Sequence, residues 1–208
     1  MKRFLILALA TAPSAALAQP VLMSAPPVPE ARVAMEVFGK CAVERRPGEA
    51  VRLLKMDFTS TAYRTGLRKL SEDVARDCAR RSFGAGVMRS SDLLFAGAMA
   101  EALMEAEAAP LNARLVRIAA SPVKTFSATD AVAQCLARSL PDQVAALFGT
   151  RPGSGAEEAA AAPLAEVIPV CARAGGVAES FELTVPAVRA MIATAAFRLL
   201  ANSGDANA

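Results

Sequence analysis

Two cysteine pairs of nearly equal spacing constrain this chain more than any other feature of its sequence. Cys41 and Cys78 are 37 positions apart and Cys135 and Cys171 are 36 apart, so the second stretch aligns with the first at an offset of 94 that becomes 93 after one deletion. A proline follows each first cysteine after six residues, and each second cysteine opens the tripeptide Cys-Ala-Arg. Because cysteine, helix-starting proline and helical period recur in one order, the pattern predicts an internal duplication.

Apolar residues recur at helical spacing between the first two cysteines. The stripe consists of Tyr63, Leu67, Leu70, Val74 and Cys78, with charged residues between them. A stripe of this period is typical of an amphipathic helix, so the cysteine at its end is expected to face inward. Helices are predicted over 31–45, 47–55, 60–81, 92–108, 111–119, 129–140, 141–148, 156–173 and 184–201. No stretch has the alternation of a strand.

These patterns predict an all-α protein built from two tandem copies of a roughly four-helix, disulfide-stapled unit with approximate internal two-fold symmetry. We expect a Pro-rich flexible arm at 19–30, helical repeat 1 at 31–109, a basic linker at 110–126, helical repeat 2 at 127–201 and a flexible tail at 202–208. The linker carries Arg114, Arg117 and Lys124 and no acidic residue.

Residues 1–18 have the organisation of a secretory signal peptide. Lys2 and Arg3 precede an apolar run, and Ala16-Leu17-Ala18 matches the small-x-small pattern at which signal peptidases cut. The run is too short to span a membrane, which needs about 20 residues. Removing this segment lowers Lys plus Arg from 23 to 21 against 20 Asp plus Glu, so the formal charge falls from +3 to +1. The mature chain is expected to be nearly neutral and periplasmic or secreted, with no transmembrane segment.

An oxidising compartment favours disulfides over thiolate metal sites. Four cysteines allow three pairings. We favour Cys41 with Cys78 and Cys135 with Cys171, because each bridge would then join neighbouring helices of one unit. Zinc is the weaker alternative, since the chain has no close cysteine pair and no histidine. No metal or cofactor is therefore predicted.

The absence of histidine excludes Ser-His and Cys-His nucleophile pairs and histidine general bases. Ser121 and Lys124 match a Ser-x-x-Lys pattern, but Phe126 stands where the related Lys-Thr-Gly element needs glycine. Gly84-Ala85-Gly86 and Gly153-Ser154-Gly155 have the composition of anion-binding loops, although neither follows a predicted strand. We interpret all three segments as turns or loops.

Glu101 and Glu105 lie one helical turn apart and are the only carboxylate pair considered for acid–base chemistry; a solvated helix face explains them equally well. Basic residues in 60–81 alternate with Glu72, Asp73 and Asp77, which argues against nucleic acid. Pairs such as Glu72 with Arg76 have helix-stabilising spacing. Met99, Met104 and Met191 are interpreted as core residues.

The sequence therefore predicts a non-enzymatic exported module of unknown role. The leading hypothesis is that it binds a protein or envelope partner between its repeats. The alternative is a carrier for a small apolar ligand or lipid, because amphipathic helices can part to admit such a molecule.

Overall fold

A computed structural model describes residues 29–83, 91–120, 123–176 and 183–203 of the chain. The described residues form nine helices and no strands, so the protein is all-α as predicted. The helices are α1 (Pro29–Arg45), α2 (Pro47–Leu54), α3 (Thr61–Phe83), α4 (Asp92–Glu105), α5 (Leu111–Arg117), α6 (Ala128–Ser139), α7 (Pro141–Phe148), α8 (Gly155–Ala174) and α9 (Val185–Asn202).

Local chemistry explains where several helices begin. Pro47 and Pro141 occupy the first positions of α2 and α7, where proline's missing N–H costs nothing. The hydroxyl of Ser60 accepts a hydrogen bond of 3.2 Å from the backbone N–H of Tyr63 and so caps α3. Ser91 caps α4 in the same way. The caps and the prolines are local signals, and the helix starts they mark lie within one residue of the predicted ones.

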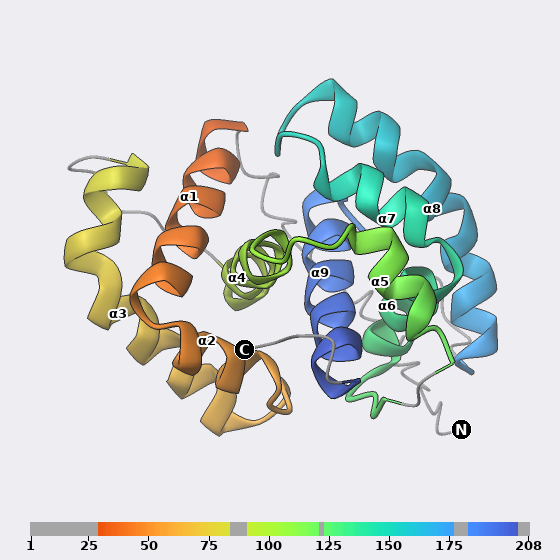
Figure 1. Ribbon diagram of the computed structural model, residues 1–208, viewed down its shortest axis with the longest axis horizontal. Helices are drawn as coiled ribbons and strands as arrows, with labels where there is room; N and C mark the ends of the chain where they lie inside the picture. Colours follow the sequence, from red (N-terminus) through yellow and green to blue (C-terminus); the bar gives the residue numbers. More distant parts are fainter. Residues whose placement is uncertain (1–28, 84–90, 121–122, 177–182, 204–208) are drawn as a thin grey trace, which may run out of the picture.

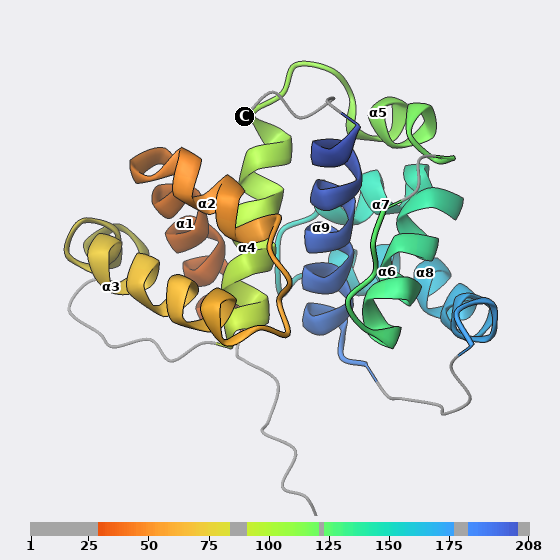
Figure 2. The same cartoon turned by 90° about the horizontal axis from the view of Figure 1, so that it is seen from below.

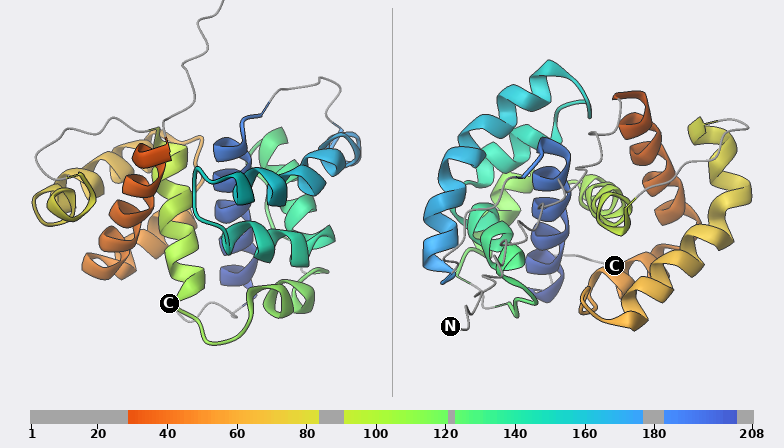
Figure 3. Two further views of the ribbon diagram at one scale, coloured as in Figure 1. Left: turned by 90° about the horizontal axis from the view of Figure 1, so that it is seen from above. Right: turned by 180° about the vertical axis from the view of Figure 1, so that it is seen from behind.

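Helices α4 and α9 form the centre of the molecule. They pack side by side and run in the same direction (Figure 2), with α1, α2 and α3 on one side and α5, α6, α7 and α8 on the other (Figure 1). α1 packs against α4 and α3, while α6 packs against α9 and α8. The view from behind in Figure 3 shows the same two groups flanking the central pair. Each outer group therefore rests on one of the two central helices.

The two central helices approach closely at Gly97 of α4 and Ala190 of α9. A Cβ atom added to Gly97 would lie 2.6 Å from the Cβ of Ala190 and 2.7 Å from its Cα. Only glycine leaves room for this contact, because the neighbouring atoms include backbone. The helix α9 is buried along most of its length, and its apolar residues join a single core with those of both outer groups.

Two disulfides connect helices within the outer groups. Cys41 of α1 is bonded to Cys78 of α3, and Cys135 of α6 is bonded to Cys171 of α8. This is the pairing favoured from the sequence. Each bridge closes a loop of 37 or 36 residues, and the chain-entropy model assigns about 4 kcal/mol to loops of that length.

Several details differ from the sequence prediction, among them the ends of α3, α5 and α9, which lie at Phe83, Arg117 and Asn202 rather than at 81, 119 and 201. α1 begins at Pro29, so the last two residues of the predicted arm are helical; proline is tolerated there because it takes the first helical position. Arg114, assigned to the basic linker, is buried and donates a 3.0 Å hydrogen bond to the carbonyl of Met104. α4 ends at Glu105 rather than at residue 108. The predicted signal peptide and most of the arm lie outside the described residues.

Within the described part of the chain, no helix combines the length and the apolar character needed to cross a membrane.

Candidate functional site

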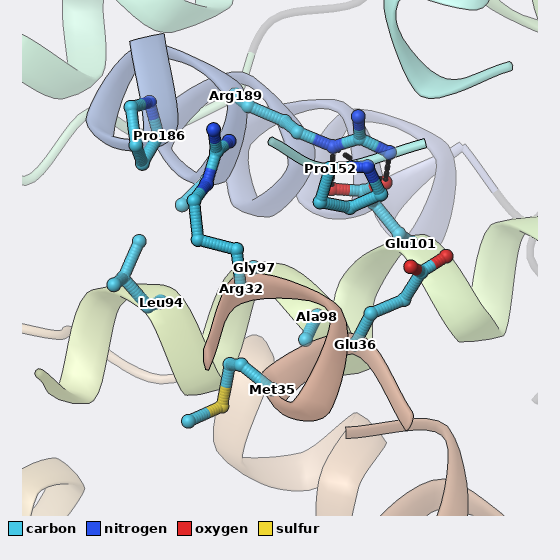
Figure 4. Close-up of a pocket in the computed structure, with 11 residues that line it drawn as sticks. Arg32, Met35, Glu36, Leu94, Gly97, Ala98, Glu101, Pro152, Pro186 and Arg189 are labelled. Atoms are coloured by element: carbon cyan, nitrogen blue, oxygen red, sulfur yellow. Dashed lines mark hydrogen bonds and ion pairs between the residues drawn. The ribbon is translucent and has the colours of Figure 1, made fainter. Parts of the chain in front are cut away.

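Two clefts flank the central helix pair, one between α4 and α9 on the side of α1, the other on the side of α6. We call the first the closed cleft. It has a volume of about 50 Å³ and its walls include Arg32 and Glu36 of α1, Glu101 of α4 and Arg189 of α9 (Figure 4). The guanidinium of Arg189 reaches across to Glu101, donating from Nη2 at 2.6 Å and from Nε at 2.9 Å. An ion pair between α4 and α9 thus crosses this cleft.

Arg189 is saturated with acceptors. Besides Glu101, its Nη1 lies 3.3 Å from Oε1 of Glu157 and donates to the carbonyls of Leu147 and Thr150 at 3.2 and 3.0 Å. Arg32 forms an ion pair with the same Glu157 oxygen, whose side chain is fully buried. The buried Arg189, the partly buried Arg32 and two carboxylates therefore compensate one another across α1, α4, α8 and α9.

Burial lowers the pKa of Arg189, but the Glu101 and Glu157 carboxylates outweigh this and leave it above its ordinary value. Burial raises the pKa of Glu101, with the hydrogen bonds from Arg189 acting in the opposite direction. Burial also raises the pKa of the half-buried Glu36. Because Arg189, Glu101 and Glu157 already satisfy one another, this part of the closed cleft has the character of a structural ion-pair network rather than a reactive centre.

The second cleft, which we call the open cavity, has a volume of about 430 Å³. Its walls come from α3, α4, α6 and α9 and from the turn before α3; they include Phe58, Tyr63, Leu93, Ala133, Ala187 and Met191. Four polar residues, Arg64, Asp92, Thr129 and Thr194, lie among these apolar ones, together with Asp130 and Arg198. The volume falls in the range of small-molecule sites, about 300–1,000 Å³.

Arg198 is the buried cation of the open cavity. Its side chain is 4% exposed and its Nη2 donates to Oδ1 of Asp130. The guanidinium carbon lies 5.4 Å from the ring centre of Phe58 and 5.7 Å from that of Phe126, within cation–π range. Its Nε is buried and has no hydrogen-bond partner among the described residues. Burial lowers the pKa of Arg198, and Asp130 only partly offsets this.

Asp130 has little acceptor capacity left for other groups. Its Oδ2 accepts from the backbone N–H of Phe126 at 3.0 Å and lies 3.4 Å from Nε2 of Gln134. Arg198 thus shares its one carboxylate with two other donors, whereas Arg189 has two carboxylates and several carbonyls. Of the two buried arginines of α9, Arg198 is the less compensated.

Tyr63 contributes a hydroxyl group to the open cavity. It is 6% exposed, and among the described residues no hydrogen bond to its hydroxyl is found. Burial raises the pKa of Tyr63 to about 12. Like any tyrosine hydroxyl at neutral pH, it is protonated and can donate a hydrogen bond.

The structure separates the two carboxylates considered for acid–base chemistry. Glu101 is held by Arg189, whereas Glu105 is exposed and lies 3.2 Å from Lys40 of α1. The solvated helix face that the sequence also allowed therefore describes Glu105 but not Glu101, which faces α9. Asp77 lies 3.7 Å from Arg45, and Arg81 lies 3.2 Å from Glu44, so both residues of α3 pair with α1.

The glycine loop at 153–155 is occupied by an anion of the chain itself. Ser154 caps α8, and the backbone N–H of Gly153 donates to Oε2 of Glu157 at 2.9 Å. Gly153 has φ of +79°, a conformation that favours glycine. The loop at 84–86, Ser121 and Pro122 lie outside the described residues. Met99 and Met104 are core residues as interpreted, but Met191 lines the open cavity.

Sequence reasoning did not single out Arg189, Arg198, Asp130 or Glu157 as site residues. A usable signal existed, because α9 is mostly apolar and its two arginines are its only charged residues. Charged residues on a helix of that kind must have partners when the helix is buried. Which partners they have depends on the packing of helices distant in sequence.

Comparisons with protein-family models, with curated proteins and with solved structures found no match for this chain. Among the described residues, no group of three or more Cys, Asp or Glu side chains is placed to hold a metal ion.

Proposed function

We propose that this protein is a non-enzymatic carrier that binds one small, mainly apolar molecule in the open cavity. The observation that carries the proposal is the cavity itself, about 430 Å³ and lined mainly by apolar side chains from both outer helix groups. A molecule of drug or lipid size fits such a volume, whereas a folded protein partner needs about 800 Å² of surface on each side. The geometry thus favours the small-ligand hypothesis over the protein-partner hypothesis.

We also propose that the chain contains the internal duplication that its sequence predicts. Hydrogen bonds at the start of α3 and α8 support it, since Ser60 and Ser154, 94 positions apart, make the same two contacts. Ser60 Oγ donates to the carbonyl of Asp57 at 2.7 Å, and Ser154 Oγ donates to that of Arg151 at 2.7 Å. Each hydroxyl also accepts a hydrogen bond of 3.2 Å from the backbone N–H three residues later, that of Tyr63 for Ser60 and that of Glu157 for Ser154.

Gly97 and Ala190 support the same arrangement, because they are 93 positions apart and contact each other between α4 and α9. In a two-fold arrangement, residues on the axis meet their own equivalents. The duplication therefore relates α1 to α6, α2 to α7, α3 to α8 and α4 to α9, with the axis passing between the central helices.

Under this relation the two clefts are equivalent positions in the two repeats. Glu36 of the closed cleft corresponds to Asp130 of the open cavity, Leu94 to Ala187 and Glu101 to Thr194. Arg189, which lines the closed cleft, corresponds to Ala96. At these positions the open cavity has the smaller side chains, which leave space for a ligand. In the closed cleft the larger side chains at the equivalent positions include the ion pair of Arg189 with Glu101. Selection for a ligand in one repeat only would produce this asymmetry.

We further propose that the chain is exported to the periplasm or secreted. Two disulfides are compatible with an oxidising compartment, and residues 1–18 have the organisation of a signal peptide. A mass spectrum of the protein recovered from the periplasm tests this. Loss of residues 1–18 and a four-hydrogen deficit support export, whereas an intact or reduced chain contradicts it.

Binding is tested with N-phenyl-1-naphthylamine, a neutral apolar dye whose fluorescence rises in apolar sites. We expect one dye per chain, and at least a tenfold weaker affinity in Ala187→Phe, which places a large side chain in the cavity. Ala146→Phe is the matched control, because Ala146 is exposed on α7 and is expected to leave binding intact. Absence of dye binding, or equal affinity in both variants, refutes the carrier proposal.

A further inference from the structure

We propose that the ligand of the open cavity is an amphiphile with an alkyl body and a single carboxylate head, bound through Arg198 and Tyr63. This inference rests on the carrier function proposed above and names the class of ligand.

Two donors that line the cavity, Arg198 and Tyr63, have incomplete hydrogen bonding among the described residues. Nε of Arg198 is buried without a partner among the described residues, although Arg198 lines the cavity. The hydroxyl of Tyr63, which also lines the cavity, makes no hydrogen bond within the same part of the chain. Buried donors are normally satisfied, so the partnerless Nε shows that Arg198 is incompletely bonded, and the Tyr63 hydroxyl is free to donate to an acceptor in the cavity.

That acceptor is expected to be anionic. Arg198 is 4% exposed and shares Asp130 with the backbone of Phe126 and the amide of Gln134. A second negative group beside the guanidinium would complete its compensation, as Glu101 and Glu157 do together for Arg189. In the open cavity the positions equivalent to Glu101 and Glu157 are Thr194 and Tyr63, both neutral. Arg198, which stands at the position equivalent to Glu105, therefore has Asp130 as its one carboxylate, and a ligand anion would be the second negative group beside it.

A carboxylate fits better than a phosphate. Two donors match two carboxylate oxygens, whereas a phosphate presents a further oxygen and a charge near −2. The carboxylates of Asp130 and Asp92 also line the cavity and would repel a dianion more strongly than a monoanion. The exposed Arg64 is the other cation among the lining residues. The remaining walls are mainly apolar, which suits an alkyl chain.

The test displaces bound N-phenyl-1-naphthylamine from the full chain with three probes of equal chain length: dodecanoate, 1-dodecanol and dodecyl phosphate. The wild type is expected to bind dodecanoate about tenfold or more tightly than dodecanol, the scale of one hydrogen bond to a charged group, and more tightly than dodecyl phosphate. In Tyr63→Phe the preference over dodecanol is expected to fall several-fold. In Asp130→Asn/Arg198→Met, which neutralises the pair together, it is expected to disappear.

Arg68→Met is the matched control, since it removes an exposed arginine of α3 that does not line the cavity; its preference should equal that of the wild type. Equal binding of dodecanoate and dodecanol by the wild type, or tighter binding of dodecyl phosphate, overturns the head-group assignment and leaves the carrier proposal standing. An unchanged preference in Tyr63→Phe overturns the assignment even if the double variant does not fold. Failure of the dye to bind at all overturns the carrier proposal itself.

Discussion

Replacing Gly97 with alanine tests the packing on which both clefts depend. Alanine is the better helix former by about 1 kcal/mol in a helix interior, so propensity alone predicts stabilisation. The new Cβ, however, would lie 2.6 Å from the Cβ of Ala190 and 2.7 Å from its Cα. Carbon atoms pack at about 3.5–4.0 Å, so α4 and α9 would have to separate by roughly 1 Å.

Overpacking of this kind costs about 1–3 kcal/mol, and the upper part of that range applies because the Cα of a packed helix cannot rotate aside. The two effects together predict that Gly97→Ala lowers the free energy of unfolding by about 1–2 kcal/mol. For a chain of this size, that corresponds to a fall in Tm of roughly 2–8 °C. The assay is urea and thermal unfolding of the oxidised protein, monitored by circular dichroism.

Gly48 provides the matched control. It also lies in a helix, but a Cβ there would meet nothing within 4 Å. Gly48→Ala is therefore expected to raise the free energy of unfolding by up to about 1 kcal/mol, because alanine restricts the unfolded chain. If Gly97→Ala stabilises the protein as Gly48→Ala does, the close contact between the central helices is refuted, and the axis proposed between them loses its support.

Two further predictions concern buried polar groups. Arg189→Leu leaves Glu101 without its cation and Glu157 with Arg32 alone, so it is expected to cost about 3–5 kcal/mol. Lys40→Ala breaks only the exposed pair with Glu105 and should lower the free energy of unfolding by less than about 1 kcal/mol. Both values are measured by urea unfolding, and similar losses in the two variants would contradict the buried network. The second prediction uses Tyr63, the single tyrosine of a chain without tryptophan, so absorbance near 295 nm reports it alone. Its pKa of about 12 lies above the unfolded value near 10, so the stability linked to the neutral phenol is fully present below pH 10 and is lost as pH rises through 12. A folded-state titration midpoint near 10, equal to that in urea, would show that the hydroxyl is not buried.

The helices and the disulfides could be predicted from the sequence because their signals are local or repeated. The apolar stripe from Tyr63 to Cys78 indicates both the helix and the inward direction of its cysteine. Pro47 and Ser60 mark helix starts through groups within three residues of them. The cysteine spacing adds one long-range constraint, since each bridge was expected to join neighbouring helices of one unit.

The candidate site could be anticipated only in outline, as a space between two repeats. Glu101 was noticed as one of a pair with Glu105, but its contact is with Arg189, 88 positions away. Helical period cannot say which neighbour a charged residue will meet, because that depends on the approach of α4 to α9.

By itself, the sequence determined the all-α class and most helix starts, and it favoured the two bridges among three possible pairings, since each follows from backbone chemistry or from the spacing of a few residues. Tertiary structure alone decided that one cleft is crossed by ion pairs and the other left as a cavity. The physical reason is that the burial of a charged side chain, and the partners that compensate its charge, depend on which helices pack against it. Arg189 meets two carboxylates, whereas Arg198 meets one and retains an unsatisfied donor at the cavity.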